Sequence, residues 1–356
     1  MKIVIDCRHI NSSGIGVYLK ECLPFFFDTK NDFLLLGDIN KLNSINVSSN
    51  TELIHCDIKP FSLNDTFLFP RSLLKKINYF DAFYSPYFNI PNGIKIPIYT
   101  TIHDIIFPDI PELTSKLGLS ARMYFYKRSF HYSKKIFTVS NFSKSRIEYY
   151  SNKQKPIIVT SNSIKTSFLS NPIKTNRSVK KDYILFVGNI KKHKGLDCLL
   201  KAFNEAKKCG LKQSLFIVGA ENGFRSKDKY FYDKLSSFQP DDVKFFNSVT
   251  DDDLSVLFRE ASLLVQPSLY EGFGIPPLEA MFFGTKALIS DIPVFREVYN
   301  EFPVTFFKPD DPVDLKENIL SILKNKEPPL IYLTNELINK YSYKKTSELI
   351  LKEIIN

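Results

Sequence analysis

The sequence predicts an α/β protein made of two doubly wound domains. Short apolar runs alternate with helix-period segments along the chain, the pattern of parallel sheets covered by helices on both faces. The length of 356 residues exceeds what one hydrophobic core usually supports. The stretch 171–181 is polar and lacks periodicity, so we interpret it as the linker between a first domain over residues 1–172 and a second over 173–339.

The expected strands are short apolar segments bounded by polar residues. In the first domain they are Ile3–Asp6, Phe33–Leu36, Glu52–Asp57, Ala82–Ser85, Ile96–His103, Ile136–Ser140 and Ile157–Ser161, and in the second Tyr183–Gly188, Leu215–Gly219, Val243–Phe246, Leu263–Pro267 and Lys286–Ser290. In doubly wound sheets, ligands bind outside the C-terminal ends of the strands. We therefore expect the ligand in a cleft between two domains that face each other.

The composition is that of a globular protein, with 44% hydrophobic and 14% aromatic residues. The five cysteines are scattered without a Cys-x-x-Cys pair, which argues against a disulfide framework and against a zinc site. The chain starts in a strand-like run, Lys2–Asp6, without signal-peptide anatomy, and contains no stretch of about 18 apolar residues. We therefore expect a cytoplasmic protein.

The net charge of +10 is concentrated in the first half of the chain. Residues 1–180 hold 24 Lys/Arg and 13 Asp/Glu, whereas residues 181–356 hold 24 and 25. This asymmetry favours a membrane surface, a phosphorylated lipid or a nucleic acid as partner, although a merely solubilising surface gives the same count. The segment Ala121–Lys135 mixes five cations with five aromatics at helical spacing, which suits either a membrane interface or a helix with core aromatics and solvated lysines.

Two features of the first domain suit ligand binding at strand ends. Gly14 and Gly16 lie where a glycine loop meets an expected helix, so N–H groups there would cradle phosphate, unless the glycines serve only a tight turn. Position 19 is Leu19, so the third glycine of a dinucleotide fingerprint is absent. His103 would donate to a ligand hydroxyl, with Asp104 setting its tautomer, or would make only a local hydrogen bond.

Two loops of the second domain carry charged residues at strand ends. The loop after the strand that starts at Tyr183 clusters lysines and His193, which suits a diphosphate or a merely solvated surface. After Leu263–Pro267, Glu271 lies on a glycine-flanked loop and Glu279 near the start of the next helix. Glu279 would complement the helix dipole in any case, whereas Glu271 is suited to accept hydrogen bonds from vicinal hydroxyls.

Together these motifs resemble the retaining glycosyltransferases of family 4, which have the two-domain GT-B fold. The matching segments run along most of the chain: Gly14–Gly16, Thr101–Asp104, Thr138–Ser143, Phe186–Gly195 and Pro267–Met281. The last of them contains the family's Glu-x7-Glu motif in full. The segment Asn335–Ile355 resembles the family's C-terminal helix, so we expect residues 340–356 to pack back on the first domain.

The resemblance implies a role for each matching residue. Glu271 would bind hydroxyls of the transferred sugar, and Glu279 would bind the ribose of the nucleotide. The remaining nucleotide-sugar contacts would come from the glycine loop with Gly14 and Gly16, from Lys194 on the diphosphate, from the backbone N–H groups of Phe273, Gly274 and Ile275, and from His103 on an outer hydroxyl of the sugar. Glu271, His103 and Lys194 are the expected catalytic residues.

The resemblance also implies the chemistry. Retaining transfer through an oxocarbenium-like state, with the leaving phosphate taking the acceptor's proton, needs no protein nucleophile, no metal and no cofactor besides the nucleotide-sugar donor. The run Asp251–Asp253 superficially offers a metal-binding Asp-x-Asp, but it suits acids at a helix N-terminus better. Many relatives carry Arg at position 189 or 193, where this chain has Asn189 and His193, and a histidine supplies charge only when protonated.

The glycine loop and the Glu-x7-Glu segment are most similar to those of bacterial O-antigen, lipopolysaccharide and capsule transferases. We expect GDP-mannose as donor and a glycan or lipid-diphosphate-linked acceptor, on a cytoplasmic protein peripheral to the inner face of the membrane. A UDP-GlcNAc or dTDP-rhamnose transferase and a glycoside hydrolase, which also uses paired carboxylates, are the alternatives. A nicotinamide dehydrogenase is disfavoured because the third glycine of the dinucleotide fingerprint is absent from this sequence. A nucleic-acid-binding protein is disfavoured because the Glu-x7-Glu motif would have no role in it.

Overall fold

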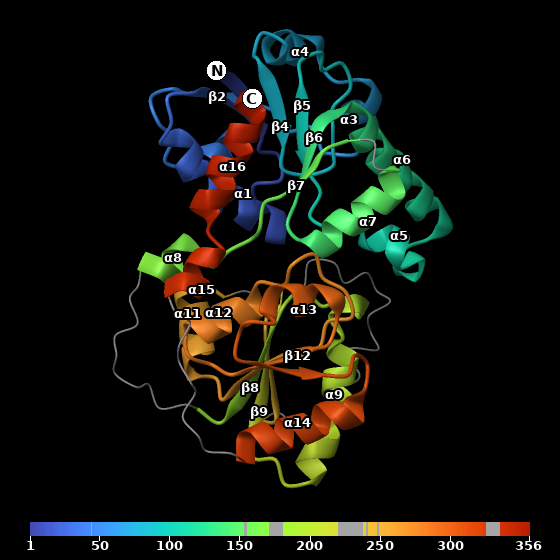
Figure 1. Cartoon of the computed structure of the whole chain (residues 1–356), viewed down its shortest axis with the longest axis vertical. Coiled ribbons are helices and arrows are strands. Elements are labelled where there is room, and N and C mark those ends of the chain that lie inside the picture. The colour runs from blue at the N-terminus through green and yellow to red at the C-terminus, as the bar shows by residue number, and fades with distance from the viewer. Residues whose placement is uncertain are drawn as a thin grey trace. The chain divides into compact units, whose positions relative to one another are not determined.

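The computed structural model describes residues 1–43, 45–152, 155–170, 181–219, 238–239, 241–247, 249–324 and 335–356. The chain forms two compact units (Figure 1). The first comprises Met1–Ser163 and Tyr341–Asn356, and the second comprises Ile164–Lys340. Each unit contains its own parallel sheet.

The sheet of the first unit has seven strands in the order β3-β2-β1-β4-β5-β6-β7. They are β1 (Lys2–Asp6), β2 (Asp32–Gly37), β3 (Thr51–His55), β4 (Ala82–Ser85), β5 (Ile98–Thr101), β6 (Ser133–Thr138) and β7 (Ile157–Val159). Ile3 and Ile5 of β1 contribute to one hydrophobic cluster, and Val4 contributes to another. Because alternate side chains are buried on opposite faces, the strands are continuous apolar runs in the sequence.

The helices of the first unit supply the other side of each cluster. They are α1 (Ser13–Phe27), α2 (Ile39–Leu42), α3 (Leu63–Phe67), α4 (Arg71–Ile77), α5 (Ile106–Asp109), α6 (Lys116–Tyr132), α7 (Asn141–Ser151) and α16 (Tyr343–Ile355). Helix α16, from the end of the chain, packs on α1 (Figure 1), where Ser347 Oγ donates to the Cys22 carbonyl at 3.3 Å. The Tyr99 hydroxyl donates to the Ile354 carbonyl at 3.1 Å, so the last helix is tied to the first sheet.

The sheet of the second unit has six parallel strands in the order β10-β9-β8-β11-β12-β13. They are β8 (Tyr183–Val187), β9 (Ser214–Val218), β10 (Val243–Phe246), β11 (Leu263–Gln266), β12 (Ala287–Ser290) and β13 (Val304–Phe307). The described helices are α8 (Thr166–Ser170), α9 (Leu196–Lys208), α11 (Asp251–Glu260), α12 (Pro276–Phe282), α13 (Pro293–Tyr299), α14 (Pro312–Lys324) and α15 (Asn335–Lys340). Leu199 and Phe203 of α9 lie in the core beneath this sheet.

The prediction of an α/β fold with two doubly wound sheets is confirmed, and every expected strand is present. Strand β13, a four-residue edge strand that pairs with β12 alone, was not predicted from the sequence. A run as short as Val-Thr-Phe-Phe carries no periodicity, and its strand conformation depends on a neighbour far away in sequence.

The second unit begins earlier in the chain than expected. Phe168 of α8 packs on Phe258 and Phe283, with ring centroids 6.5 and 5.1 Å apart. These contacts place α8 in the second unit, so the boundary lies at Ser163 and Ile164 instead of at residue 172. Residues 171–180 of the expected linker lie outside the described residues.

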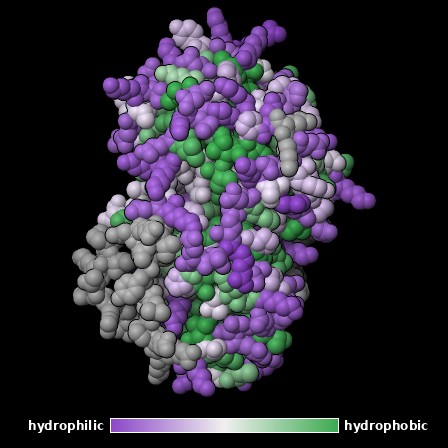
Figure 2. Space-filling model, viewed as in Figure 1, coloured by the Kyte–Doolittle hydropathy of each residue, from purple (hydrophilic) through white to green (hydrophobic). Residues whose placement is uncertain are grey.

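The strand order reverses once in each sheet, between β1 and β4 in the first and between β8 and β11 in the second. Chain segments leave these neighbouring strands toward opposite sides, which opens a crevice at their carboxyl ends where ligands bind in doubly wound sheets. Over the described residues, no helix is long and apolar enough to cross a bilayer. Figure 2 shows hydrophilic side chains around the margin of the first unit.

Candidate functional site

The two loops at the reversal point of the second sheet bring Lys194 and Glu271 together. Lys194 lies in the short 3-10 helix Lys192–Lys194 after β8, and Glu271 lies in the loop after β11. The Lys194 ammonium group donates to both carboxylate oxygens of Glu271, at 2.6 and 2.7 Å. Both side chains are largely buried, so their attraction is screened less than that of a surface pair. Both residues were predicted to lie at strand ends, but their pairing was not predicted.

The two loops touch because Gly195 has no side chain. Its φ is +69°, and a Cβ atom at this position would overlap the carbonyl oxygen of Pro267. Next to this contact the Leu269 N–H donates to the His193 carbonyl at 2.7 Å. The backbone of the β8 loop therefore lies directly on the backbone of the β11 loop, and this contact sets the position of the Lys194–Glu271 pair.

Buried hydroxyl and amide groups hold Glu271 from the side of the sheet. Ser268 Oγ donates to Glu271 Oε1 at 2.8 Å and accepts from Gln266 Nε2 at 3.0 Å. Ser290 Oγ, at the end of β12, donates to the Ser268 carbonyl. Ser268, Gln266 and Ser290 were not predicted as supporting residues, although polar side chains at the ends of two buried strands were a usable signal.

The segment after Glu271 forms a tight turn into α12. Gly274 has a φ of +83°, and a Cβ atom there would overlap the ring of Phe295. The Tyr299 hydroxyl donates to the Gly274 carbonyl, so α13 braces the turn on the same side. Phe273 is buried, and Ile275 is the residue that precedes α12. The turn thus has a defined backbone course between Glu271 and the helix.

Glu279 lies in the first turn of α12, as its position in the sequence predicted, and its side chain is buried. Two consecutive prolines, Pro276 and Pro277, start this helix, because proline fits the first helical positions without losing a hydrogen bond. The two glutamates therefore lie at the two ends of one short, braced segment. Their assignment to sugar and ribose stays a prediction.

His193 does not supply the positive charge that a diphosphate-binding arginine would bring. Burial, with a smaller contribution from the neighbouring Lys194, lowers the pKa of His193 to about 4, and Glu271 opposes these effects only in part. The imidazole is therefore neutral at pH 7. Asn189, in the same loop, is also neutral, so within this loop positive charge comes from the lysines alone.

In the first unit, Gly16 serves the contact between α1 and the loop before it. A Cβ atom at Gly16 would overlap the Ile10 carbonyl oxygen, whereas a Cβ atom at Gly14 would meet no atom within 4 Å. The absence of a side chain at Gly16 thus has a structural reason, as the tight-turn alternative proposed. A phosphate-binding role for Gly14 and Gly16 stays a prediction.

The structure changes the expected roles of His103 and Asp104. His103 Nε2 lies 3.0 Å from the Pro86 carbonyl oxygen, which can only accept, so this nitrogen carries the proton. Burial lowers the pKa of His103 to about 4, which leaves Nδ1 as an acceptor at neutral pH. Asp104 Oδ1 accepts from the Ile106 N–H at 3.2 Å. The tautomer is therefore set by Pro86, and His103 would accept from a ligand hydroxyl instead of donating to it.

The segment Ala121–Lys135 is not a single helix. Helix α6 ends at Tyr132, and Lys134 and Lys135 belong to β6. Tyr126 and Phe130 are buried in the core, as the interpretation with core aromatics expected. Tyr124 and Tyr132 are exposed, so the helix also keeps an aromatic outer face.

The acidic run Asp251–Asp253 forms the first turn of α11, as predicted. Thr250 caps this helix by accepting from the Asp253 N–H at 3.1 Å, and Asp251 pairs with Lys165 at 2.5 Å. Among the described residues, no group of three or more His, Cys, Asp or Glu side chains is arranged to hold a metal ion.

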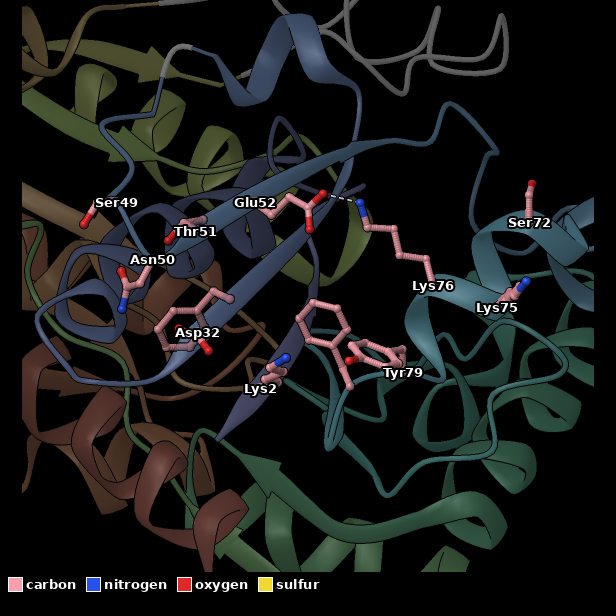
Figure 3. Close-up of a pocket in the computed structure, with 12 residues that line it drawn as sticks. Lys2, Asp32, Ser49, Asn50, Thr51, Glu52, Ser72, Lys75, Lys76 and Tyr79 are labelled. Carbon is pink, nitrogen blue, oxygen red and sulfur yellow. Dashed lines mark hydrogen bonds and ion pairs between the residues drawn. The ribbon is translucent and has the colours of Figure 1, made fainter.

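The first unit has a surface hollow of about 700 Å³ (Figure 3). Lys2, Asp32 and Thr51 line it, and each is the first residue of its strand or next to it, so the hollow lies at the amino-terminal edge of the sheet. Glu52 and Lys76 are paired across it. The residues of the first unit that were predicted to bind ligand lie after the carboxyl ends of the strands, at the opposite edge of the same sheet. We therefore do not assign the reaction to this hollow.

Comparison with known proteins identifies the family. Residues 169–344 match the model of the family Glycosyl transferases group 1. The O-antigen chain mannosyltransferase RfbU of Salmonella typhimurium is 30% identical over 260 residues, which cover 70% of this chain and 67% of the relative. The chain belongs to the group 1 glycosyltransferases. A second relative of this glycosyltransferase, the O-antigen chain mannosyltransferase B of Escherichia coli, is 26% identical over 256 residues, 68% of this chain and 65% of that one.

Solved structures share the fold of this group 1 glycosyltransferase. Sucrose-phosphate synthase from Thermosynechococcus elongatus superposes with a TM-score of 0.76 at 15% identity and covers 99% of this chain and 98% of its own. Anabaena HepE in complex with UDP and glucose gives a TM-score of 0.74 at 16% identity, with 99% of each chain covered. At these identities the likeness shows the fold alone, and it agrees with the GT-B fold that the motifs implied.

The contact at Gly195 predicts a large stability cost for a single methyl group. Gly195→Ala adds a Cβ atom that overlaps the Pro267 carbonyl, and it also places a side chain at a left-handed backbone position. We expect the overlap to lower the free energy of unfolding by at least about 2 kcal/mol beyond the cost of the left-handed conformation. Gly210→Ala is the matched control, because Gly210 also has a positive φ, of +89°, but faces open space. Urea unfolding of both variants measures the difference, and equal costs would contradict the contact.

The lowered pKa of His193 predicts how stability depends on pH. The unfolded imidazole, with a pKa near 6.5, binds a proton that the folded one rejects until about pH 4, so stability falls as pH drops between these values. His193→Gln should remove about 1–2 kcal/mol of this loss at pH 5. The measurement is the urea midpoint of the wild type and of His193→Gln between pH 7 and 5. An unchanged slope in His193→Gln would contradict a buried neutral imidazole.

Proposed function

We propose that this glycosyltransferase moves a mannosyl group from GDP-mannose to a hydroxyl of a glycan or lipid-diphosphate-linked acceptor, with retention of the anomeric configuration, in synthesis of an O-antigen-type surface polysaccharide. The observation that supports it most is the Lys194–Glu271 pair at the reversal point of the second sheet. The relatives named as O-antigen mannosyltransferases support the sugar and the polysaccharide class.

The paired charges match the two parts of a nucleotide sugar. An ammonium group neutralises a diphosphate, and a carboxylate accepts hydrogen bonds from sugar hydroxyls. In the structure these groups satisfy one another, so a bound donor would separate them, with Lys194 turning to the phosphates and Glu271 to the sugar. Each buried charge would then exchange one partner for another and would not be left unpaired. Glu279, at the far end of the braced segment, would bind the ribose.

The proposed reaction breaks the bond between C1 of the sugar and the diphosphate oxygen and forms a bond between C1 and the acceptor oxygen on the same face. The acceptor's proton passes to the departing phosphate oxygen, so the atoms balance without a protein nucleophile. Lys194 would stabilise the charge that develops on the leaving diphosphate, where a preorganised cation contributes most. The scheme calls for no metal ion.

In the first unit, His103 is suited to bind a hydroxyl as an acceptor through Nδ1. Its tautomer is held by the Pro86 carbonyl, and its edge-on contact with Tyr18, at 4.9 Å between ring centroids, restrains the ring. In the second unit, neutral His193 and Asn189 leave the diphosphate to the lysines. Donor binding should therefore not gain a histidine charge between about pH 6 and 8.

The geometry at Glu271 is less suited to a glycoside hydrolase. Such an enzyme needs one carboxylic acid that donates a proton to the leaving group. Glu271 accepts hydrogen bonds from Lys194 and Ser268, which suits an ionised carboxylate and not a carboxylic acid that donates a proton. UDP-GlcNAc and dTDP-rhamnose stay open as donors, because no contact of the base is defined.

A donor screen tests the proposal. Thermal shifts with GDP-, UDP-, dTDP- and ADP-sugars report binding, since a ligand that prefers the folded state raises the melting temperature with its affinity. We expect the largest shift with GDP-mannose, and transfer to a lipid-diphosphate glycan whose new linkage, by NMR, has the donor's anomeric configuration. Transfer that inverts the anomeric configuration would refute the retaining mechanism. The largest thermal shift with another sugar nucleotide would refute GDP-mannose as the donor.

Loss of the Glu271 carboxylate should abolish transfer without unfolding the chain. Glu271→Gln removes the charge that orients the sugar hydroxyls, and we expect kcat/KM to fall at least about 100-fold, the range of a lost charged hydrogen bond in the transition state. Glu317→Gln, an exposed carboxylate on α14, is the control with wild-type activity. Near-normal activity of Glu271→Gln would rule out its assignment to the sugar.

Ser268 should act as a positioning residue for Glu271. Ser268→Ala removes the hydrogen bond that fixes one carboxylate oxygen, and we expect about a tenfold loss in kcat/KM. Affinity for the free nucleoside diphosphate, measured by calorimetry, should stay unchanged, because Glu271 is assigned to the sugar alone. Equal weakening of the sugar nucleotide and of the free diphosphate would show that the substitution distorts the whole site.

A further inference from the structure

We propose that the hollow at the amino-terminal edge of the first sheet binds a segment of a neutral glycan, apart from the site of transfer. Its lining residues come from the starts of three neighbouring strands, β1, β2 and β3, and from α4 and the turn after it (Figure 3). Its volume of about 700 Å³ lies within the range of roughly 300–1,000 Å³ that small-molecule sites occupy. That the glycan belongs to the polysaccharide being built rests on the proposed function.

The ring of Tyr79 is open to solvent within the hollow. Tyr79 is 75% exposed, and Lys2 Nζ lies over its ring, 5.0 Å from the centroid. The face of an aromatic ring is electron-rich, so it attracts an ammonium group and also the weakly positive C–H groups on the apolar face of a pyranose sugar. A sugar ring is therefore suited to stack on Tyr79, with its hydroxyls directed to the groups around it.

The backbone around Tyr79 is held by hydrogen bonds on both sides, so the ring is not exposed by a loose turn. Asn78, which ends α4, donates from Nδ2 to the Gly93 carbonyl at 3.0 Å. Asp81 accepts from the Lys2 N–H at 2.7 Å, which ties the turn to β1. A ring that is already positioned loses little conformational freedom when a ligand binds, so more of the contact energy appears as affinity.

Hydrogen-bond donors and acceptors surround the ring. Figure 3 shows Asp32 on one side of Tyr79 and Lys75 on the other, and among the described residues neither side chain has a hydrogen-bond or ion-pair partner. The hydroxyls of Ser49 and Ser72 line the hollow further out. Each sugar hydroxyl can donate and accept, so a carboxylate and an ammonium group without partners suit it, and charged groups make the stronger hydrogen bonds.

The charges of the hollow favour a neutral ligand over a phosphate. Lys76 is paired with Glu52, which leaves Lys2 and Lys75 against Asp32. A phosphate in the hollow would meet two carboxylates as well as the lysines, and like charges repel. A neutral sugar uses carboxylates and ammonium groups alike.

The hollow lies across the first sheet from the residues that were predicted to bind ligand. At about 3.3 Å per residue, the five residues of β1 separate the two edges of the sheet by roughly 15 Å. A glycan that reached both edges would therefore be several sugars long. The hollow would hold a part of the polysaccharide remote from the reacting hydroxyl, and a second contact on the same glycan raises the effective concentration of its reacting end.

Binding of α-linked mannotetraose to the full chain, measured by saturation-transfer difference NMR, tests the proposal. Tyr79→Ala should weaken binding at least about tenfold, because the stacking surface is lost, and Tyr79→Phe, which keeps the ring, should stay within about twofold of the wild type. Tyr149→Ala, which removes a 68% exposed tyrosine on α7, is the matched control and should bind as the wild type does. Absence of wild-type binding, or equal binding by Tyr79→Ala, would overturn the proposal.

A charge variant distinguishes a glycan site from an anion site. Asp32→Asn should weaken mannotetraose binding, because it replaces a carboxylate by a weaker acceptor. Binding of inorganic pyrophosphate that Asp32→Asn strengthens and Lys75→Gln removes would identify an anion site and overturn the proposal.

The thermal shift given by the sugar nucleotide separates this proposal from the proposed function, and each variant of the hollow should keep it. A normal sugar-nucleotide shift without mannotetraose binding would contradict the glycan site alone. Mannotetraose binding that depends on Tyr79, without a sugar-nucleotide shift, would contradict the proposed function alone.

Discussion

The backbone contact between the loops that follow β8 and β11 is the constraint on which the candidate site depends. It requires a residue without a side chain at Gly195, because the Pro267 carbonyl occupies the space of a Cβ atom. The same contact brings Lys194 within hydrogen-bond distance of Glu271. Without this contact the two charged side chains would lie on separate loops, and burying either of them would leave a charge without its partner.

The surrounding structure supports this contact from the end of β11 and from α13. Ser268 and Gln266 hold Glu271 from the end of β11, and Tyr299 of α13 holds the turn at Gly274. Burial keeps His193 neutral, so the charge balance of the site is between Lys194 and Glu271. Once a bound donor has drawn Lys194 from Glu271 to the diphosphate, groups braced in this way would need little further rearrangement as charge develops on the leaving group.

Much of the fold could be predicted because parallel strands and amphipathic helices leave a periodic signal in the sequence. The edge strand β13 and the boundary at Ser163 could not, since pairing with β12 and the packing of Phe168 depend on residues far along the chain. Glu271 and Lys194 were identifiable from motif and position. Their pairing and the tautomer of His103 follow from three-dimensional contacts that no local pattern encodes.

The most direct measurement is a crystal structure of the protein with an intact, non-transferable sugar nucleotide. We predict that Lys194 Nζ moves from its 2.6 and 2.7 Å contacts with Glu271 to the diphosphate, while the Glu271 carboxylate, still held by Ser268, accepts from the sugar hydroxyls. A bound donor that leaves the Lys194–Glu271 pair intact and lies away from both side chains would contradict it.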